Sequence, residues 1–258
     1  HVYMMFGYDQ SMKRRWLAIF LLGLGGCVAG GIPTATERSP PRVLVLGGTG
    51  QLGVMVTREL VTAGARVVVF ARPNSDRSVL AGLPVEFVTG DLLVADEVER
   101  ALRGRRFDVI VSAVRVEDGD PNFYSKMMPP LLTAARAAGV RQFIHHGAVG
   151  AGDNVKKFTG LGWERVPGIF ERLKDQGEGE RLLRQSGIRY TIIRNARLYP
   201  ADHAATGVAK LTEDDTVLTP MTRADLARLT RECLLAVACL DKTYHVRDDS
   251  LAWPPPRR

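Results

Sequence analysis

A run of seven residues, positions 47–53, has the residue types and spacing of a phosphate-binding turn. It follows an apolar stretch, residues 43–46, and precedes a segment with apolar residues at helical spacing. The first glycine lets the chain turn, a second lets the backbone approach a pyrophosphate, and the last lets helix and strand pack closely. The helix start also offers unpaired N–H groups to phosphate oxygens. Unless this is a glycine-rich turn without a ligand, we expect a dinucleotide to contact Gly47, Gly48, Thr49, Gly50, Gln51, Leu52 and Gly53.

A second apolar run, residues 66–70, is followed by a basic residue rather than an acidic one. In dinucleotide-binding folds an acid here accepts a hydrogen bond from the ribose 2′-OH of NAD, whereas a guanidinium pairs with the 2′-phosphate of NADP. Arg72 occupies this place, with Ser75 and Arg77 just beyond it. The sequence therefore favours NADP(H) over NAD. Two alternatives stay open: Asp76 could serve an NAD ribose if the loop folds back, and Arg72 could be a solvated loop charge.

These residues need a scaffold in which strands and helices alternate. Short apolar runs predict strands at residues 43–46, 66–70, 85–88, 107–113, 141–145 and 190–194. Helical spacing predicts helices after residue 51, at 96–102, from the proline pair 129–130 to before Gly139, and at 178–185 and 222–240. The alternation predicts an α/β fold with a doubly wound parallel sheet. We expect a single domain with a small C-terminal portion on the substrate side.

Length and composition exclude several other classes. The chain has 258 residues, of which 45% are hydrophobic and 24% charged, enough to bury one large core. The net charge is +7, but basic residues cluster at the two ends, so we expect no nucleic-acid partner. No Cys/His cluster has zinc-ligand spacing, so we expect no metal. Cys233 and Cys239 lie six apart on one predicted helix, about 9 Å along its axis, which predicts free thiols in the core.

The first forty residues have the layout of an export signal. Three basic residues, 13–15, precede the apolar run 16–27, which as a helix spans about 18 Å, short of the roughly 30 Å membrane core. Residues 24–27 resemble the bacterial lipobox, whose cysteine, here Cys27, becomes lipidated. We therefore expect a leader and tether over residues 1–41 and a dinucleotide-binding domain over 42–258. The expected location is the bacterial cell envelope, with membrane contact only through the lipid. Two alternatives stay open: the protein could be exported by another secretory route, or it could be cytoplasmic with a misleading leader.

Several segments together resemble one known superfamily. The glycine turn, Arg72, the step Gly90-Asp91-Leu92 and residues 186–200 (SGIRYTIIRNARLYP) are similar to atypical short-chain dehydrogenases/reductases, in the NAD(P)H-binding, NmrA-like group. The resemblance covers roughly residues 42 to 250. It implies a Rossmann-like fold and a nicotinamide dinucleotide as partner. It also implies that Asp91 and Leu92 border the adenine, and that Ala113 and Val114 border the cofactor from the fourth strand.

The catalytic pattern of this superfamily is missing from the chain. Its typical reductases use a Tyr, a Lys four residues later on the same helix face, and a Ser or Thr that orients the carbonyl. No Tyr-x-x-x-Lys occurs among the six tyrosines. The resemblance places Arg172 at the Tyr position, Gln176 at the Lys position, and Gly147 and Ala148 where relatives tend to have hydroxyl residues.

Two functional hypotheses follow from this loss. The chain could be an NADP(H)-binding oxidoreductase-like protein that reduces an unknown small carbonyl or enone compound without the usual pair. Alternatively, it could be a non-catalytic NAD(P)H-binding redox sensor or assembly scaffold. His146, at a strand end, is a weak candidate acid, although a structural hydrogen bond is the more common role of such a histidine. Further candidates for the missing acid are Tyr124, Asp153 and Lys174, and Arg194 and Arg197 could bind an anion or be ion-paired.

Overall fold

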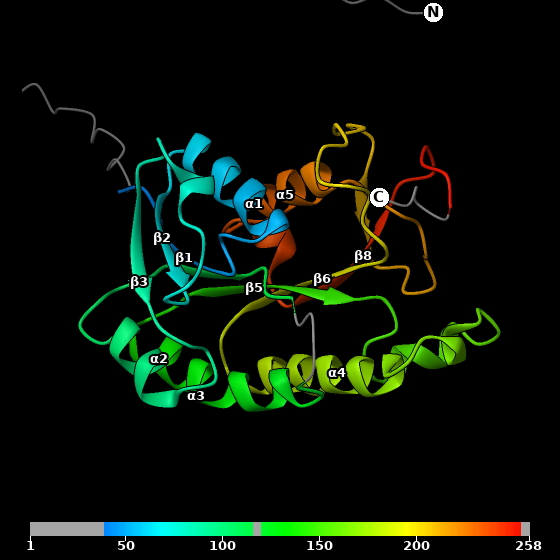
Figure 1. The fold of residues 1–258 in the computed structure, drawn as a ribbon, viewed down its shortest axis with the longest axis horizontal. Coiled ribbons are helices and arrows are strands. Elements are labelled where there is room, and N and C mark those ends of the chain that lie inside the picture. Colours follow the sequence, from blue (N-terminus) through cyan, green and yellow to red (C-terminus); the bar gives the residue numbers. More distant parts are fainter. Residues whose placement is uncertain (1–38, 116–119, 254–258) are drawn as a thin grey trace, which may run out of the picture. The chain divides into compact units, whose positions relative to one another are not determined.

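The computed structural model describes residues 39–115 and 120–253, which build a central sheet between two layers of helices (Figure 1). Eight strands are hydrogen-bonded in the order β3-β2-β1-β4-β5-β6-β8-β7. All neighbouring strands are parallel except β7, which runs antiparallel to β8. The strands are β1 (Arg42–Leu46), β2 (Arg66–Ala71), β3 (Val85–Thr89), β4 (Val109–Ser112), β5 (Gln142–Ala148), β6 (Tyr190–Asn195), β7 (Lys210–Thr212) and β8 (Lys242–Arg247).

Helices cover both faces of this sheet. In Figure 1, α1 and α5 lie on one face, and α2, α3 and α4 lie on the other. Within each layer α1 packs against α5, and α3 packs against both α2 and α4. The α-helices are α1 (Gln51–Thr62), α2 (Ala95–Leu102), α3 (Phe123–Ala137), α4 (Ile169–Gln185) and α5 (Arg223–Glu232). The 3-10 helices are η1 (Ser78–Leu80), η2 (Gly152–Lys157), η3 (Trp163–Arg165) and η4 (Val237–Cys239).

Strand β1 shows why the apolar runs form this sheet. Its side chains alternate between the two helical layers: Leu44 and Leu46 join the core under α2, α3 and α4, while Val43 and Val45 join the core under α1 and α5. All four are fully buried. A strand covered on both faces needs apolar residues at every position, which is why such strands are continuous apolar runs rather than alternating ones. The predicted doubly wound parallel sheet is confirmed.

The predicted start of α3 is wrong. The proline pair was expected to open this helix, but α3 begins six residues earlier, and Pro129 and Pro130 lie inside it. The reason is a distant carboxylate. Asp175, in α4, accepts hydrogen bonds from the backbone N–H groups of Tyr124 at 2.7 Å and Ser125 at 2.9 Å. These contacts satisfy N–H groups that a first helical turn leaves unpaired, so the helix can begin well before its prolines.

The predicted end of α5, and with it the prediction of free thiols, is also wrong. The start is confirmed, because Thr222 Oγ1 accepts from Asp225 N–H at 3.0 Å as an N-cap. The helix stops at Glu232, however, and the next residues turn back, with Leu235 in the left-handed region at φ 55°. This turn brings Cys233 and Cys239 together in a disulfide with a Cα–Cα distance of 5.4 Å. The helical spacing of about 9 Å therefore does not apply.

Strands β7 and β8 were not expected from the sequence, whose apolar runs end with β6. Strand β8 is only partly buried and sits beside β6, and β7 closes the edge of the sheet. The predicted leader and the lipidation site Cys27 lie outside the described residues. Within residues 39–115 and 120–253, no helix is both long enough and apolar enough to cross a membrane. That part of the chain also groups no His, Cys, Asp or Glu side chains as a metal site would.

Candidate functional site

The turn between β1 and α1 has the geometry of a phosphate cradle. Gly47 lies in the left-handed region at φ +72°, and its carbonyl oxygen accepts from Gly50 N–H at 3.0 Å, which closes the turn. A Cβ atom on Gly47 would come within 2.8 Å of the carbonyl oxygen of Ala113, at the end of β4. Both the backbone conformation and the close approach therefore require glycine at this position.

Gly53, the last residue of the glycine-rich run 47–53, explains how closely α1 can approach the turn. A Cβ atom on Gly53 would lie 2.0 Å from the carbonyl oxygen of Gly47, so only glycine allows the first turn of α1 to pack there. Gly50 is the N-cap and provides no side-chain acceptor, and the first helical turn has no acidic residue. The helix N-terminus thus keeps its positive end available to an anion. Of the remaining predicted contacts, Gly48 is buried, Thr49 and Leu52 are half-buried, and Gln51 is exposed.

A cavity of about 330 Å³ lies where β2 and β3 end. It is lined by Arg72, Pro73, Asn74 and Asp91. The Arg72 side chain is exposed, and among the described residues its guanidinium has no hydrogen-bond or ion-pair partner. An unpaired guanidinium at the wall of a cavity can form a bidentate pair with a phosphate group. Pro73 and Asn74 could not be predicted as lining residues, because neither has a distinctive type or spacing in the sequence.

Asp76, the acidic residue that could have bound an NAD ribose, already accepts hydrogen bonds from its own loop. Asp76 Oδ1 accepts from Ser78 N–H at 2.9 Å and from Ser78 Oγ at 2.6 Å, at the start of η1. These two hydrogen bonds hold the pKa of Asp76 below its ordinary value. Arg77 is turned toward β3, where it donates to Thr89 Oγ1 and lies over the ring of Phe87. Arg72 is therefore the charged side chain that this loop leaves free at the cavity.

The predicted residues of β3 and β4 lie around the same edge of the sheet. Asp91 is held in its turn, because its Oδ1 accepts from Leu93 N–H at 2.8 Å, and neighbouring Leu92 is buried. At the end of β4, Ala113 is buried against the glycine turn, and the Val114 carbonyl oxygen accepts from Tyr124 Oη at 3.0 Å. The parallel sheet thus brings the carboxyl ends of β1, β2, β3 and β4 to one edge, as the sequence predicted. Their contacts with a cofactor stay a prediction.

The segment where relatives keep a proton relay contains no relay here. Gly147 and Ala148 end β5 without a hydroxyl group. Arg172 is exposed, and its Nε donates to the Gly168 carbonyl at 3.3 Å. The side-chain oxygen of Gln176 is buried without a hydrogen-bond partner. That oxygen can accept a hydrogen bond from a ribose hydroxyl, but an amide carries no positive charge that could lower the pKa of a neighbouring acid.

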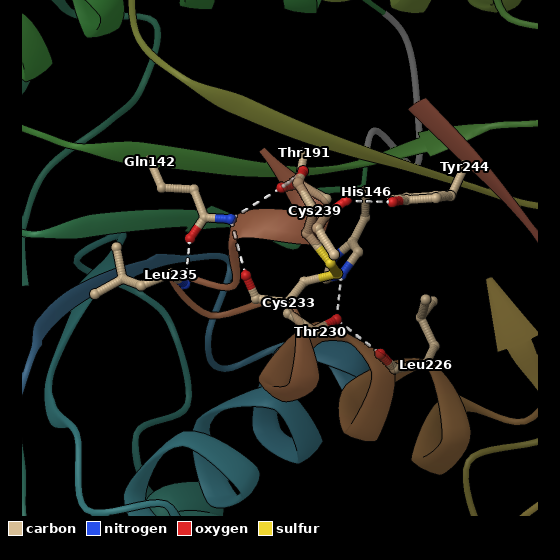
Figure 2. The surroundings of a disulfide bond; sticks show 10 residues. Gln142, His146, Thr191, Leu226, Thr230, Cys233, Leu235, Cys239 and Tyr244 are labelled. Atoms are coloured by element: carbon tan, nitrogen blue, oxygen red, sulfur yellow. Dashed lines mark hydrogen bonds between the residues drawn. A yellow bond between two sulfur atoms is a disulfide. The ribbon is translucent and has the colours of Figure 1, made fainter. Parts of the chain in front are cut away.

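His146 points away from this segment, toward α5. Its Nε2 lies 2.8 Å from Thr230 Oγ1, and that hydroxyl donates its own proton to the Leu226 carbonyl at 2.7 Å (Figure 2). The imidazole must therefore donate through Nε2, which fixes the neutral tautomer with an unpartnered Nδ1. Burial lowers the pKa of His146 to about 3, so at neutral pH the side chain is a neutral imidazole and not the imidazolium that would act as an acid. This geometry favours the structural role over the catalytic one.

The other candidate acids are also committed or remote. Tyr124 is buried, its pKa is raised by burial, and its hydroxyl is bound to the Val114 carbonyl. Asp153 is exposed and paired with Lys156. Arg194 is ion-paired with the fully buried carboxylate of Glu180, a residue that sequence analysis did not single out. No residue type or local spacing marks Glu180, because its partner lies on β6, fourteen residues further along the chain.

Comparisons with known proteins agree with this geometry. Residues 47–236 match the sequence model of a family described as NAD(P)H-binding. Sterol demethylase protein B of Methylococcus capsulatus is 33% identical over 168 residues, which cover 60% of this chain and 51% of that protein. The photosystem II assembly factor Ycf39 of Cyanophora paradoxa is 25% identical over 202 residues, covering 75% and 59%. The chain thus spans only about half to three-fifths of the length of these relatives.

Solved structures share the fold at lower identity. ChuY of Escherichia coli O157:H7, described as an anaerobillin reductase, has a TM-score of 0.70 and 23% identity, and the match covers 82% of this chain and 98% of that one. A short-chain dehydrogenase/reductase of Veillonella parvula, solved with NADP, has a TM-score of 0.65 and 17% identity, covering 84% and 98%. At these identities the similarity demonstrates the fold alone.

Proposed function

The chain belongs to the NAD(P)H-binding family. We propose that it falls in the NmrA-like group of atypical short-chain dehydrogenases/reductases, that its cofactor is NADPH and that it reduces a small carbonyl or enone compound. A bound NADPH supplies the hydride. The chain contributes the diphosphate cradle at Gly47 to Gly53 and a guanidinium for the 2′-phosphate. With no Tyr/Lys relay in the described residues, the proton that follows the hydride comes from water.

One observation carries the choice of NADPH over NADH: the free guanidinium of Arg72. It lines the cavity at the ends of β2 and β3 and has no partner among the described residues, while Asp76 is held by Ser78. A ribose 2′-OH usually pairs with an acidic side chain at this place, and Asp76, the acid nearest in sequence, is held by Ser78. A 2′-phosphate at this place would instead pair with the free guanidinium of Arg72.

Titration of the protein with NADPH and with NADH, followed by nicotinamide fluorescence, tests this proposal. We expect tighter binding of NADPH. Arg72→Gln should weaken NADPH binding by about tenfold or more, because a charge-assisted pair to phosphate contributes roughly 1.5–3 kcal/mol, and should leave NADH binding unchanged. Arg106→Gln, at another exposed arginine, is the matched control. Equal affinities for both cofactors, or an Arg72→Gln variant that still prefers NADPH, would refute the choice of cofactor.

A second candidate function is a non-catalytic NADPH-binding scaffold. The observation that favours it is the loss of the relay's hydroxyl groups, at Gly147, Ala148 and Arg172, and of the Lys charge, at Gln176. Ycf39, described as an assembly factor, is one of the relatives. The two functions differ in turnover. NADPH consumption in the presence of aldehydes, quinones, enones, a sterol ketone or anaerobilin supports the reductase, whereas tight NADPH binding without consumption supports the scaffold.

The location also stays a proposal, the bacterial cell envelope with a lipid on Cys27. The disulfide between Cys233 and Cys239 supports it, because disulfides persist mainly in oxidising compartments. The lipobox-like residues 24–27 support it as well. Labelling cells with a radioactive fatty acid tests it: the full chain should take up label, and Cys27→Ser should not. A chain that stays unlabelled and whose two other cysteines are reduced in cells would refute the proposal.

A further inference from the structure

A second cavity, of about 660 Å³, lies between α4 and η2, with the end of β6 beside it. Its size falls within the range of small-molecule sites, roughly 300–1,000 Å³. Small residues bring the two walls together: a Cβ atom on Gly177 of α4 would lie 2.3 Å from the Cα atom of Gly152 in η2. The cavity is therefore built on a fixed contact between two segments of backbone.

Two arginines share one carboxylate at this cavity. Glu180 is fully buried, and the side chain of Arg194 is only 10% exposed. Arg194 donates to Glu180 through Nε at 3.1 Å and through Nη2 at 2.6 Å, and Arg184 Nη2 donates to the same carboxylate at 3.0 Å. One negative charge thus faces two positive charges. The Nη1 group of Arg194 makes no hydrogen bond within the described residues, and Arg194 lines the cavity.

The other acidic residues at the cavity are already neutralised. Glu178 is paired with Arg181, and Asp215 is paired with Lys157. The remaining acid, Asp153, is paired with a lysine outside the cavity. Lys174 has no hydrogen-bond or ion-pair partner anywhere in the described part of the chain, although it lines the cavity. The cavity therefore presents positive charge without a matching countercharge, which favours an anionic ligand.

An apolar surface adjoins these cations. Phe170 is 47% exposed at the cavity, although a large aromatic side chain is usually buried. Leu173 and Val155 line the cavity beside it. A bare inorganic anion would leave this surface in water. A ligand with one carboxylate and an apolar body of moderate size would satisfy both the cations and Phe170.

Lys174, the unpaired cation that α4 contributes to this cavity, is on a different face of the helix from Gln176 at the missing relay. Lys174 and Gln176 are two positions apart, and at about 100° per residue their side chains leave the helix roughly 200° apart. Lys174, Gly177 and Arg181, which line the cavity, are spaced three and four residues apart and share one face. Lys174 therefore points away from the place where the resemblance puts the cofactor.

We propose that the cavity between α4 and η2 binds a small organic monocarboxylate with an apolar body, independently of the dinucleotide. The carboxylate pairs with Lys174 and with the free Nη1 of Arg194, and the apolar body packs on Phe170 and Leu173. Nothing in this proposal requires the ligand to be the substrate of a reductase.

Calorimetric titration of the full chain with octanoate and with phenylacetate tests the proposal, with octanamide, phenylacetamide and inorganic phosphate as comparison ligands. We expect the carboxylates to bind, and the amides and phosphate to bind at least about tenfold more weakly, because each comparison ligand lacks either the charge or the apolar body. Saturating NADPH should not displace the carboxylates. No binding of either carboxylate, equal binding of the amides, or displacement by NADPH would each overturn it.

Two variants localise the binding. Lys174→Gln should weaken carboxylate binding by about tenfold and leave thermal unfolding unchanged, because Lys174 is exposed and unpaired. Lys210→Gln, at another exposed lysine without a partner in the described chain, is the matched control and should bind as the wild type does. Phe170→Ala should remove the preference for octanoate over phosphate. If Lys174→Gln binds octanoate as tightly as Lys210→Gln does, the carboxylate lies elsewhere and the proposal is wrong.

Discussion

The disulfide between Cys233 and Cys239 closes a turn that the buried amide of Gln142 also holds. Gln142 Nε2 donates to the Cys233 carbonyl at 2.9 Å, and its Oε1 accepts from Leu235 N–H at 2.6 Å (Figure 2). Thr191 Oγ1 donates to the Cys239 carbonyl at 2.7 Å. The turn after α5 is thus closed by the disulfide and tied to β5 and β6 by hydrogen bonds, so it should survive reduction in a native-like form.

Loss of the disulfide should lower stability without unfolding the protein. The paired variant Cys233→Ser, Cys239→Ser should lose about 2 kcal/mol of unfolding free energy, as expected for closing a short loop in the unfolded chain. Chemical denaturation with and without dithiothreitol measures this. Reductant should destabilise the wild type by a similar amount and leave the variant unchanged. A wild type whose unfolding midpoint does not respond to reductant would contradict the role of the bond.

Removal of the cap on α3 should be costly. Asp175 is 6% exposed and accepts from two backbone N–H groups and from Ser125 Oγ at 2.7 Å. Asp175→Ala leaves these donors unpaired, and we expect a loss of about 2 kcal/mol in urea denaturation. Asp153→Ala, at a carboxylate whose side chain is 95% exposed, is the control and should change stability by less than about 0.5 kcal/mol. Similar losses in both variants would disprove the capping role.

Gly53→Ala should disrupt the phosphate turn. The added methyl group meets the Gly47 carbonyl oxygen at 2.0 Å and the Gly48 Cα atom at 2.7 Å, and both are backbone atoms that cannot rotate away. We expect NADPH affinity to fall by about tenfold or more, together with a lower unfolding temperature. Thr62→Ala, at the exposed end of the same helix, serves as control. Binding by Gly53→Ala with wild-type affinity would show that the cradle does not hold the diphosphate.

Two buried histidines should make stability depend on pH. Burial lowers the pKa of His145 to about 4 and that of His146 to about 3, from an ordinary value of 6.5. Between pH 6.5 and pH 4 the unfolded chain therefore binds more protons than the native chain, so stability must fall as the pH falls. Urea denaturation at pH 7, 6 and 5 should show this decline, and the variant His146→Leu should show a shallower one. A variant with the same slope as the wild type would contradict the buried, neutral state of His146.

The local chemistry of the sequence was enough to predict the strand, turn and helix that form the proposed phosphate cradle. Gly47, Gly50 and Gly53 act over a few residues, where backbone conformation and close approach depend on residue type alone. The continuous apolar run of β1 likewise determined that both faces of the sheet are covered. Arg72 was found because its place after β2 follows from the order of the elements.

Only the tertiary structure decided the features that depend on residues far apart in the chain. The start of α3 depends on Asp175, fifty positions away, and the disulfide depends on where α5 stops and turns back. The tautomer of His146 depends on Thr230 across the core, and the second cavity depends on Glu180 meeting Arg194. Such contacts leave no local pattern, because the free energy that selects them comes from burial and pairing in the folded chain rather than from the preferences of neighbouring residues.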